Sequence, residues 1–368
     1  MMFAGFFLAV VSVPPLLQAG VEIARGRRPQ FLDLFFTPPV RPRLRAWEHE
    51  LEQASVIAQA VRPWVQYVWF KLLDYAGEKV LLGREDWLFY KPDVRYLVEP
   101  AAFDAAHEDP YPAILDFRDQ LARQGTMLIV LPMPGKPSIY PEKLTARAEA
   151  NGIRSHTLDL IRRLQAAGVE TIDLFQAFEK AREADKPPIY LRRDTHWSPQ
   201  AAEAAAEIVA ARVRALGIEE GNATYQVRNV SIQRPGDIVK MIQSPGIANV
   251  YISEQVQASQ VIGFKDDPSS PVLVLGDSFL RIYQTDEPRS AGFIAHLARA
   301  LRMPLATIVN DGGASTLVRQ ELARRTHLLR GKKLLLWEFV ERDIRFGTEG
   351  WKLIPLPVSE GSREPNPK

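Results

Sequence analysis

The stretch Pro271-Val-Leu-Val-Leu-Gly-Asp-Ser-Phe279 decides the fold that we expect for this chain. Residues 272–275 form a continuous apolar run with β-branched side chains, which is typical of a strand buried on both faces of a parallel sheet. Gly276 ends the run and permits a tight turn, and Asp277 and Ser278 then stand where a following helix begins. Ser278 is therefore expected at the carboxyl end of a buried strand, where open α/β sheets bind ligands.

A serine in this position has the surroundings that an acyl-transfer nucleophile needs. Its backbone N–H lies at a helix N-terminus, where developing negative charge is favoured. The letters Gly-Asp-Ser after a strand also occur as a plain turn with a helix cap. The motif alone leaves both interpretations open.

Segments of the same kind recur along the chain and alternate with amphipathic ones. Strands are expected at residues 127–131, 169–174, 305–309 and 334–339, with shorter ones at 189–191 and within 80–90. Helices are expected at residues 111–124, 153–167, 174–184, 201–216, 290–302 and 315–329. This alternation predicts a doubly wound parallel sheet with helices on both faces. Residues 217–268 are less regular and show only short β-like runs.

The composition excludes several classes of function. The 46 basic and 44 acidic residues leave a net charge of +2, too small to indicate nucleic-acid binding. The chain has no cysteine, which rules out thiolate metal sites, cysteine nucleophiles and disulfides. No Gly-x-Gly-x-x-Gly follows a strand and no Gly-Lys-Ser/Thr loop occurs, so no cofactor is predicted.

The N-terminal region predicts an attachment to a membrane. Residues 1–19 carry no charge and fit either a signal-peptide core or a short spanning helix that Pro14-Pro15 would kink. We favour an uncleaved signal-anchor or transmembrane helix over residues 1–24. The first basic residues, Arg25, Arg27 and Arg28, would by the positive-inside tendency keep the following chain in the cytoplasm.

Residues 25–79 are expected to form a helical stalk, because apolar residues recur at helical spacing up to an interruption at Pro63. A pair of packing helices is the simpler interpretation, while Trp64, Trp69 and Phe70 leave a partner-helix or membrane-surface role open. Residues 80–357 have the composition of one α/β domain. Residues 358–368, rich in Pro, Gly, Ser and charge, are predicted to be disordered.

A second polar segment, Asp194-Thr-His-Trp197, follows a predicted strand and precedes a capped helix. Residues two apart in an extended segment point the same way, so Asp194 can accept a hydrogen bond from one ring nitrogen of His196 while the other faces outward. That is the carboxylate–imidazole half of a hydrolase-type triad. A metal pair or a structural salt link would use the same residues, but no further ligand cluster lies nearby in sequence, and no metal is predicted.

A third polar turn, Asn310-Asp-Gly-Gly313, also follows a predicted parallel strand. Its backbone or amide donors could reach an oxyanion. Three such turns, carrying serine, Asp/His and Asn/Gly, are more informative together than any of them alone.

With these segments in hand, the chain resembles the periplasmic alginate O-acetyltransferase family, whose catalytic domain is similar to the SGNH/GDSL hydrolases. The matching segments, in the family's order, are Gly83-Arg-Glu-Asp-Trp-Leu-Phe-Tyr90, Pro134-Gly-Lys-Pro-Ser-Ile-Tyr-Pro141, Asp194-Thr-His-Trp197, Gly236-Asp-Ile238, Gly276-Asp-Ser-Phe279, Asp311-Gly-Gly313 and Trp337-Glu-Phe339. In ordinary SGNH hydrolases the serine block comes before the Asp/His block. The reversed order seen here favours the acetyltransferase family and an SGNH hydrolase-like fold.

The resemblance implies a serine O-acyltransferase with Ser278 as nucleophile, His196 as general base and then acid, and Asp194 as the group that fixes its tautomer. An acetyl group would be held on Ser278 as an ester and passed to a hydroxyl of an exported polysaccharide. The family's acetyl donor is delivered across the membrane by a membrane-bound O-acyltransferase partner. The resemblance therefore implies a periplasmic or extracytoplasmic protein tethered to the inner membrane by residues 1–24, the opposite orientation to the one that Arg25, Arg27 and Arg28 favour.

The resemblance also suggests supporting residues. Gly312, Gly313 or Asn310 would help the backbone N–H of Ser278 to hold the oxyanion, and Tyr283 and Arg193 would contact the substrate or support the catalytic groups. The sequence departs from the family around residues 30–80 and shows no carbohydrate-binding module after the catalytic domain. The identity of the polysaccharide therefore stays open.

Two other functions fit the same residues. A carbohydrate esterase would use the same triad with water as acceptor, because acceptor choice depends on how well water is excluded. A catalytically silent, membrane-tethered glycan-binding scaffold would keep only the fold. The presence of all three triad candidates favours an enzyme over the scaffold.

Overall fold

The computed structural model describes residues 2–36, 40–99, 109–151, 153–183, 187–242, 244, 246–247 and 250–357. The chain divides into two units, which we call the helical unit (residues 1–77 and 242–250) and the α/β unit (residues 78–241 and 251–368). The predicted disordered tail, residues 358–368, lies outside the described residues.

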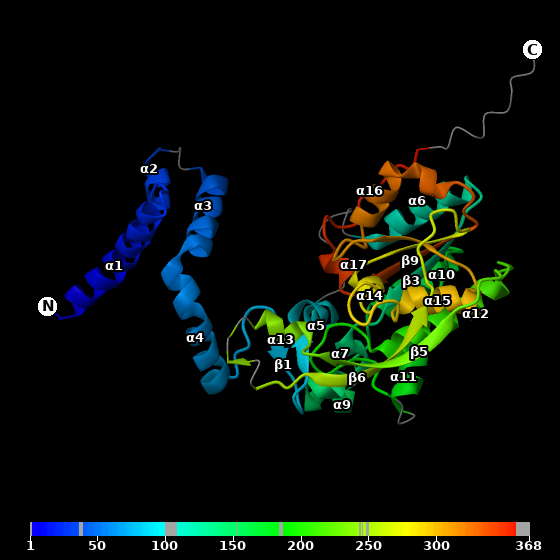
Figure 1. The fold of residues 1–368 in the computed structure, drawn as a ribbon, viewed down its shortest axis with the longest axis horizontal. Helices are drawn as coiled ribbons and strands as arrows, with labels where there is room; N and C mark the ends of the chain where they lie inside the picture. Colours follow the sequence, from blue (N-terminus) through cyan, green and yellow to red (C-terminus); the bar gives the residue numbers. More distant parts are fainter. Residues whose placement is uncertain are drawn as a thin grey trace, which may run out of the picture. The chain divides into compact units, whose positions relative to one another are not determined.

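A five-stranded parallel sheet forms the centre of the α/β unit (Figure 1). Its spatial order is β4 (Glu170–Thr171), β3 (Met127–Met133), β9 (Leu334–Val340), β7 (Val272–Gly276) and β8 (Ala306–Val309). Every residue of β7 is buried, as expected for a strand covered on both faces. The last strand in sequence, β9, lies between β3 and β7.

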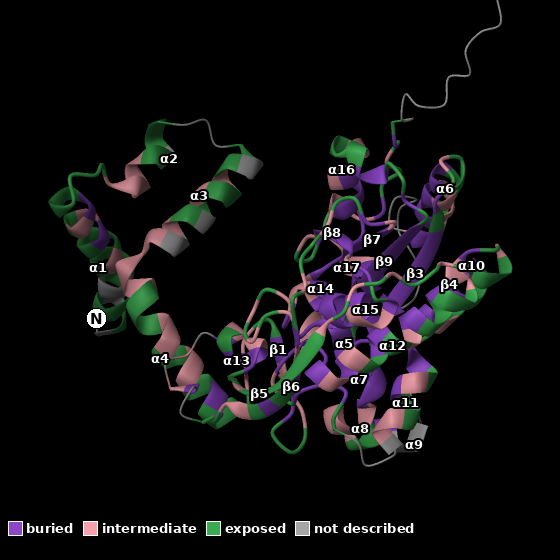
Figure 2. Cartoon of the chain, turned by 45° about the vertical axis from the view of Figure 1, so that its right-hand side comes forward, coloured by how far each residue is buried: buried purple, intermediate pink, exposed green. Residues whose placement is uncertain are grey.

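Helices cover both faces of this sheet, so the predicted doubly wound architecture is confirmed. Alternate residues of each strand join different cores, which is why Val274 and Leu336 lie in one core and Leu275 and Leu335 in the other. On the first face lie α12 (Pro199–Ala215) and α15 (Phe293–Leu301), and on the second α6 (Pro110–Ala122), α10 (Thr157–Ala166) and α16 (Leu317–Arg324). Figure 2 shows the sheet as a largely buried layer.

Shorter elements complete the α/β unit. The strands β1 (Val80–Leu82) and β2 (Leu88–Tyr90) pair antiparallel, as predicted. The remaining helices are α5 (Lys91–Val98), α7 (Lys136–Ile139), α8 (Pro141–Leu144), α9 (Ala146–Asn151), α11 (Phe175–Glu183), α13 (Asp237–Met241), α14 (Ser278–Arg281), η3 (Thr326–Leu329) and α17 (Asp343–Phe346).

The predicted strand at residues 189–191 is wrong. Tyr190 forms only an isolated antiparallel bridge with Trp197, and Ser198 N donates to Ile189 O at 2.7 Å. These contacts join the two ends of residues 190–197, which therefore form a closed loop. We call it the histidine loop.

The irregular pattern expected for residues 217–268 is also wrong. Two strands, β5 (Gln226–Arg234) and β6 (Glu254–Ile262), pair antiparallel over nine positions each. Most residues of β5 are exposed, so buried and exposed residues do not alternate regularly along it. Its sequence therefore lacks the alternation of apolar and polar residues that identifies a strand. The two strands are also separated by a long connection rather than a short turn, which removes the usual sequence signature of a hairpin.

The helical unit contains α1 (Met2–Ala24), η1 (Gln30–Leu32), α2 (Asp33–Phe36), α3 (Arg41–Ala54) and α4 (Val56–Leu73). The segment Gly5–Ala24 of α1 is long and apolar enough to cross a membrane, a property that signal sequences share. Both Pro14 and Pro15 lie inside α1.

The interruption predicted at Pro63 is wrong, because Pro63 lies inside α4. The break falls instead at Ser55, whose hydroxyl caps α4 by accepting from Ala58 N at 3.2 Å. Packing from residues 242–250 supports the proline-containing turn, since Ser244 Oγ donates to Pro63 O at 3.2 Å and Gly246 lies against the ring of Tyr67. An interior proline removes one backbone donor but does not end a helix that such contacts hold.

Candidate active site

Ser278 lies at the carboxyl end of β7, as the first residue of α14. Asp277 caps this helix by accepting a hydrogen bond from Phe279 N at 2.8 Å. Asn310 N donates to Gly276 O at 3.0 Å, which ties the turn to the end of β8. A Cβ at Gly276 would collide with the carboxyl group of Glu338 and the side chain of Leu280, so only glycine fits there. This packing leaves Ser278 half-buried and open to the cleft described below.

The histidine loop brings its imidazole to this serine. His196 Nε2 lies 2.9 Å from Ser278 Oγ, and His196 Nδ1 lies 2.8 Å from Asp194 Oδ1. The backbone N–H of His196 also donates to Asp194 Oδ1 at 3.1 Å. The structure thus joins the three residues predicted from two separate motifs into one chain of hydrogen bonds, carboxylate to imidazole to hydroxyl.

Groups from three other segments hold the histidine loop. Arg234, at the end of β5, donates to Asp194 Oδ2 at 2.7 Å. Asp237 accepts from the backbone N–H of Thr195 at 2.7 Å and from its hydroxyl at 2.5 Å. Lys136 Nζ, fully buried, donates to the carbonyl oxygens of the two residues at the start of the loop, at 3.1 Å each. Because charged groups make these bonds in a buried setting, the loop has little freedom to move.

The charges around His196 set its proton affinity. Burial alone would lower the pKa of this imidazole, but the hydrogen bond to Asp194 and the charge of Asp237 outweigh it, so the pKa is raised, with Arg342 opposing the rise. Burial would raise the pKa of Asp194, yet its bonds to His196 and Arg234 hold that pKa well below its usual range. Asp194 therefore stays ionised beside the ring at neutral pH.

Two more acidic side chains lie beneath the serine. Glu338, on β9, accepts from Asp277 N at 3.1 Å. Burial, reinforced by the charge of Asp277, raises the pKa of Glu338 well above its usual value. Burial also raises the pKa of Asp277. The carboxyl group of Glu338 fills the space beside Gly276.

A cleft of about 540 Å³ opens over Ser278 and His196. Its walls carry both signs of charge, including Arg281 and Arg342. Arg281 Nε donates to both carboxylate oxygens of Asp311 at 2.9 and 2.8 Å, and Arg342 donates to Asp93 at 3.0 Å. The cleft can therefore offer many hydrogen bonds to a hydroxyl-rich ligand.

Of the three predicted oxyanion residues, Gly312 alone lines the cleft. Gly312 has a φ of +67°, a conformation that favours glycine. Gly313 N donates to Asn310 O at 3.0 Å, and the Asn310 amide lies close over Gly313. Asn310 and Gly313 thus shape the turn that presents Gly312.

The structure places Tyr283 and Arg193 behind the catalytic groups rather than in the cleft. Tyr283 is fully buried, and its hydroxyl donates to Trp197 O at 3.1 Å. The guanidinium of Arg193 lies 5.0 Å from the ring centre of Tyr251 and donates to Ile252 O. A substrate contact is therefore not supported for either residue, and both support the histidine loop.

Sequence reasoning assigned no role to Arg234, Asp237 or Lys136. The signal for two of them was present, because Asp237 and Lys136 belong to the short segments that carried the family resemblance. Nothing in the sequence pattern indicated a role for Arg234, because it is the last residue of β5, a strand that was not predicted.

Asp194, His196 and Asp237 lie close enough together for one metal ion, with ligand atoms within 4.8 Å of one another. Both oxygens of each carboxylate already accept hydrogen bonds from the protein, namely from His196 and Arg234 on Asp194 and from Thr195 on Asp237. The cluster offers three ligands, and hydrogen bonds within the protein already orient each of them, so we assign no metal to it.

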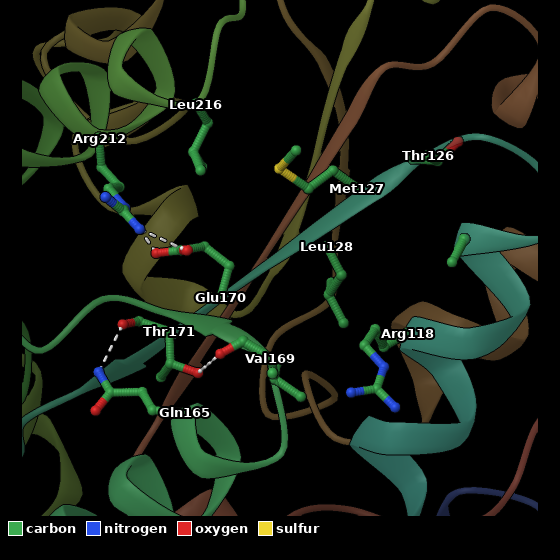
Figure 3. A pocket seen from close by; sticks show the side chains of 12 residues that line it. Arg118, Thr126, Met127, Leu128, Gln165, Val169, Glu170, Thr171, Arg212 and Leu216 are labelled. Carbon is green, nitrogen blue, oxygen red and sulfur yellow. Dashed lines mark hydrogen bonds and ion pairs between the residues drawn. The ribbon is translucent and has the colours of Figure 1, made fainter.

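A second cavity, of about 620 Å³, lies at the opposite, amino-terminal end of β3, beside Met127 (Figure 3). Arg212 makes two hydrogen bonds of 2.7 Å to Glu170 across it, and Gln165 donates to Thr171 O at 3.1 Å. These polar side chains bond within the protein, and the cavity contains none of the predicted site residues.

Gly236 offers a test of how the histidine loop is held. Its φ is +83°, and a Cβ there would overlap the carbonyl group of Arg193. We expect Gly236→Ala to lower the free energy of unfolding by roughly 3 kcal/mol, from backbone strain plus this clash. Gly263→Ala is the matched control, because Gly263 has a φ of +90° but open space around the Cβ position. It should cost only about 1 kcal/mol. Chemical unfolding of the full chain measures both, and equal losses would contradict the proposed clash.

Residues 80–341 match the family described as "SGNH hydrolase-like domain, acetyltransferase AlgX". The "Probable alginate O-acetylase AlgJ" of Pseudomonas aeruginosa is 26% identical over 287 residues, which cover 73% of this chain and 71% of that protein. The protein of the same name from Azotobacter vinelandii is 25% identical over 281 residues, covering 72% and 69%.

Two solved structures show the same fold. The O-acetyltransferase domain of Pseudomonas putida AlgJ has a TM-score of 0.59 at 23% identity, covering 72% of this chain and 92% of that one. Pseudomonas aeruginosa AlgX has a TM-score of 0.54 at 21% identity, covering 74% and 68%. The expected SGNH hydrolase-like fold of the α/β unit is confirmed.

Proposed function

The chain belongs to the SGNH hydrolase-like acetyltransferase family of AlgX, and on that basis we propose that it is a serine-dependent O-acetyltransferase acting on an exported polysaccharide. One observation carries the serine-dependent part. His196 Nε2 lies 2.9 Å from Ser278 Oγ in an open cleft, while Asp194 holds the other ring nitrogen. The alginate O-acetylases named among its relatives support a polysaccharide as the acceptor.

In the first half-reaction, Ser278 Oγ attacks the carbonyl carbon of a donor acetyl group as His196 Nε2 takes the hydroxyl proton. The imidazolium then returns this proton to the departing donor group, leaving an acetyl ester on Ser278. In the second half-reaction, His196 Nε2 takes the proton of a sugar hydroxyl, whose oxygen attacks the ester. The product is an acetylated sugar, and the proton goes back to Ser278 Oγ.

Both tetrahedral intermediates carry negative charge on the former carbonyl oxygen. The backbone N–H of Ser278 is one donor for it, because it stands at the first position of α14. The turn around Gly312 lines the same cleft and is the segment that we propose for a second donor. Arg342, which also lines the cleft, adds a positive charge.

The setting that we propose is periplasmic, with α1 anchoring the chain in the inner membrane. The apolar Gly5–Ala24 segment and the names of the relatives support this. A membrane-bound O-acyltransferase would supply the acetyl groups, as the family resemblance implies, and residues 25–79 would join the anchor to the catalytic domain at residues 80–357. No nucleic-acid partner is proposed.

Transfer and hydrolysis can be told apart with a chromogenic acetyl ester as donor. With the full chain, we expect a covalent acetyl group on the peptide that contains Ser278, and faster ester turnover when an oligosaccharide acceptor is added, with acetyl appearing on the sugar. Release of acetate alone, unaffected by any acceptor, would identify an esterase. If no acetyl or fluorophosphonate label forms on Ser278, the serine mechanism is contradicted. That result would favour the catalytically silent glycan-binding scaffold.

The pH dependence tests the charges around His196. The imidazole must be neutral to accept a proton, so the rate rises with pH through its pKa. Asp194, Asp237 and Arg342 face the ring, and Asp237 raises that pKa. Replacing Asp237 by asparagine should therefore move the acidic limb of kcat/KM to lower pH, by about one pH unit.

The control for this prediction is Asp311→Asn. Asp311 also lines the cleft, but its side chain is 55% exposed and it pairs with Arg281. Replacing Asp311 by asparagine should leave the acidic limb of the kcat/KM profile at the same pH. An upward shift with Asp237→Asn, or equal shifts in the two variants, would contradict the assignment of the limb to His196.

A further inference from the structure

Helix α4 presents an apolar face to solvent. Val61, Trp64, Val65, Val68 and Leu72 recur at helical spacing and are all exposed, with Trp64 67% and Leu72 76% accessible. We call these five residues the outer face of α4. The opposite side is the packed one, since Phe70 is buried and Tyr67 lies against Gly246. The helix therefore directs a continuous apolar stripe outward, the reverse of an ordinary surface helix.

The charges of α4 are placed at the borders of this face. At about 100° per residue, Lys71 falls on one border and Arg62 on the other. No acidic residue occurs between Ser55 and Leu73. A helix with an apolar face, basic borders and tryptophan side chains is of the kind that lies in a membrane interface. Trp69, 45% exposed, adds a second indole at the border of the outer face that carries Arg62.

The start of α4 is bound to the apolar helix α1. Val56 N donates to Gln18 Oε1 at 2.9 Å, and Gln18 Nε2 donates to Ala54 O at 3.1 Å. Gln18 lies in the Gly5–Ala24 segment, six residues before its end, which corresponds to about 9 Å along a helix. If α1 spans a bilayer with Ala24 at its boundary, α4 therefore begins about 9 Å below that boundary, within the depth of about 5–10 Å to which an interfacial helix buries its apolar face.

We propose that the outer face of α4 lies on the surface of an anionic lipid bilayer, next to the point where α1 enters it. A protein partner is the other conceivable occupant. The outer face consists wholly of Val, Leu and Trp side chains, whereas protein interfaces carry regular hydrogen bonds. The basic borders match the negative potential of anionic lipid. The proposal does not depend on the chemistry at Ser278, so the two can fail separately.

The natural absence of cysteine allows a clean test. Val61, Val68 and Leu72 are changed singly to cysteine in the full chain and labelled with an environment-sensitive fluorophore. Ala46→Cys, on an exposed position of α3, is the matched control. The proteins are reconstituted into vesicles of phosphatidylcholine with phosphatidylglycerol, then quenched with either spin-labelled lipid or aqueous iodide.

We expect the three outer-face positions to be quenched several-fold more by lipid than the Ala46 control, and less by iodide. Iodide quenching equal to that of the control would overturn the proposal, as would protection that appears only in native membranes containing other proteins. A second measurement needs no cysteine. Brominated lipid should quench the tryptophan emission of the unmodified chain, and a Trp64→Phe/Trp69→Phe variant should lose most of that quenching. Unchanged quenching in that variant would count against the proposal.

Discussion

Replacing Ser278 with alanine is expected to lower kcat for acetyl transfer by about a million-fold, since removal of the nucleophile of such a triad disables the whole unit. The hydroxyl is the atom that His196 reaches at 2.9 Å, and alanine leaves nothing to hold the acetyl group. The fold should persist, because Ser278 is half-buried and the helix cap is made by Asp277. Turnover of a chromogenic acetyl ester measures the loss of kcat, and mass analysis of the peptide that contains position 278 measures the loss of the acetyl-enzyme.

Ser269→Ala is the matched control for this change. Ser269 is exposed, and its hydroxyl bonds only locally, to Asp267 Oδ1 at 2.6 Å. That variant should keep full turnover and the acetyl-enzyme. Substantial turnover by the Ser278→Ala protein would show that the hydroxyl does not carry the acetyl group, and the proposed mechanism would be lost.

Replacing Asp194 with asparagine is expected to lower kcat by about ten-thousand-fold while the fold remains. Arg234 donates to one oxygen of Asp194 and His196 Nδ1 faces the other. An asparagine amide offers one oxygen and one NH₂ group, and Arg234, which has no acceptor, takes the oxygen. The NH₂ group then faces Nδ1 and the backbone N–H of His196, and the charged Arg234 outweighs that N–H in the competition for the oxygen. The ring therefore carries its proton on Nε2 and cannot accept one from Ser278.

This explanation makes a further prediction for a double variant. With Arg234→Met added to Asp194→Asn, the amide is free to turn its oxygen toward Nδ1, and part of the lost rate should return. The comparison is made at fixed pH by kcat, with circular dichroism to verify the fold. If the double variant is no faster than Asp194→Asn, the loss comes from the missing charge and not from the orientation of the amide.

The central sheet could be predicted from sequence because its strands are apolar without interruption. The run at residues 272–275 has no interpretation as an exposed strand, and β9 repeats the pattern. The β5–β6 pair escaped prediction because its residues are largely exposed and its partners are distant in sequence. The helix break predicted at Pro63 was wrong for a related reason. Local helix propensity does not include the contacts that Ser244 and Gly246 make with α4 from a distant part of the sequence.

The residues of the candidate site also fall into those that a local sequence pattern predicts and those that it does not. Ser278, His196 and Asp194 each follow a recognisable local pattern, and the fold brings their side chains together. Tyr283 was expected to contact the substrate or to support the catalytic groups. Its side chain is buried and donates to Trp197 O, and its closeness to the serine in sequence did not distinguish the two roles. Arg234 reaches Asp194 through a pairing of strands that no local pattern reveals.

The position of β9 has a consequence for how the protein is made. Among the strands of the described residues β9 is synthesised last, yet it occupies the middle of the sheet, hydrogen-bonded to β3 on one side and β7 on the other. Before residue 340 emerges, those two neighbours have no common partner and the nascent polypeptide cannot complete its core. A chain built this way keeps an incomplete core until β9 has been made, which would suit the passage across a membrane that the proposed periplasmic setting requires.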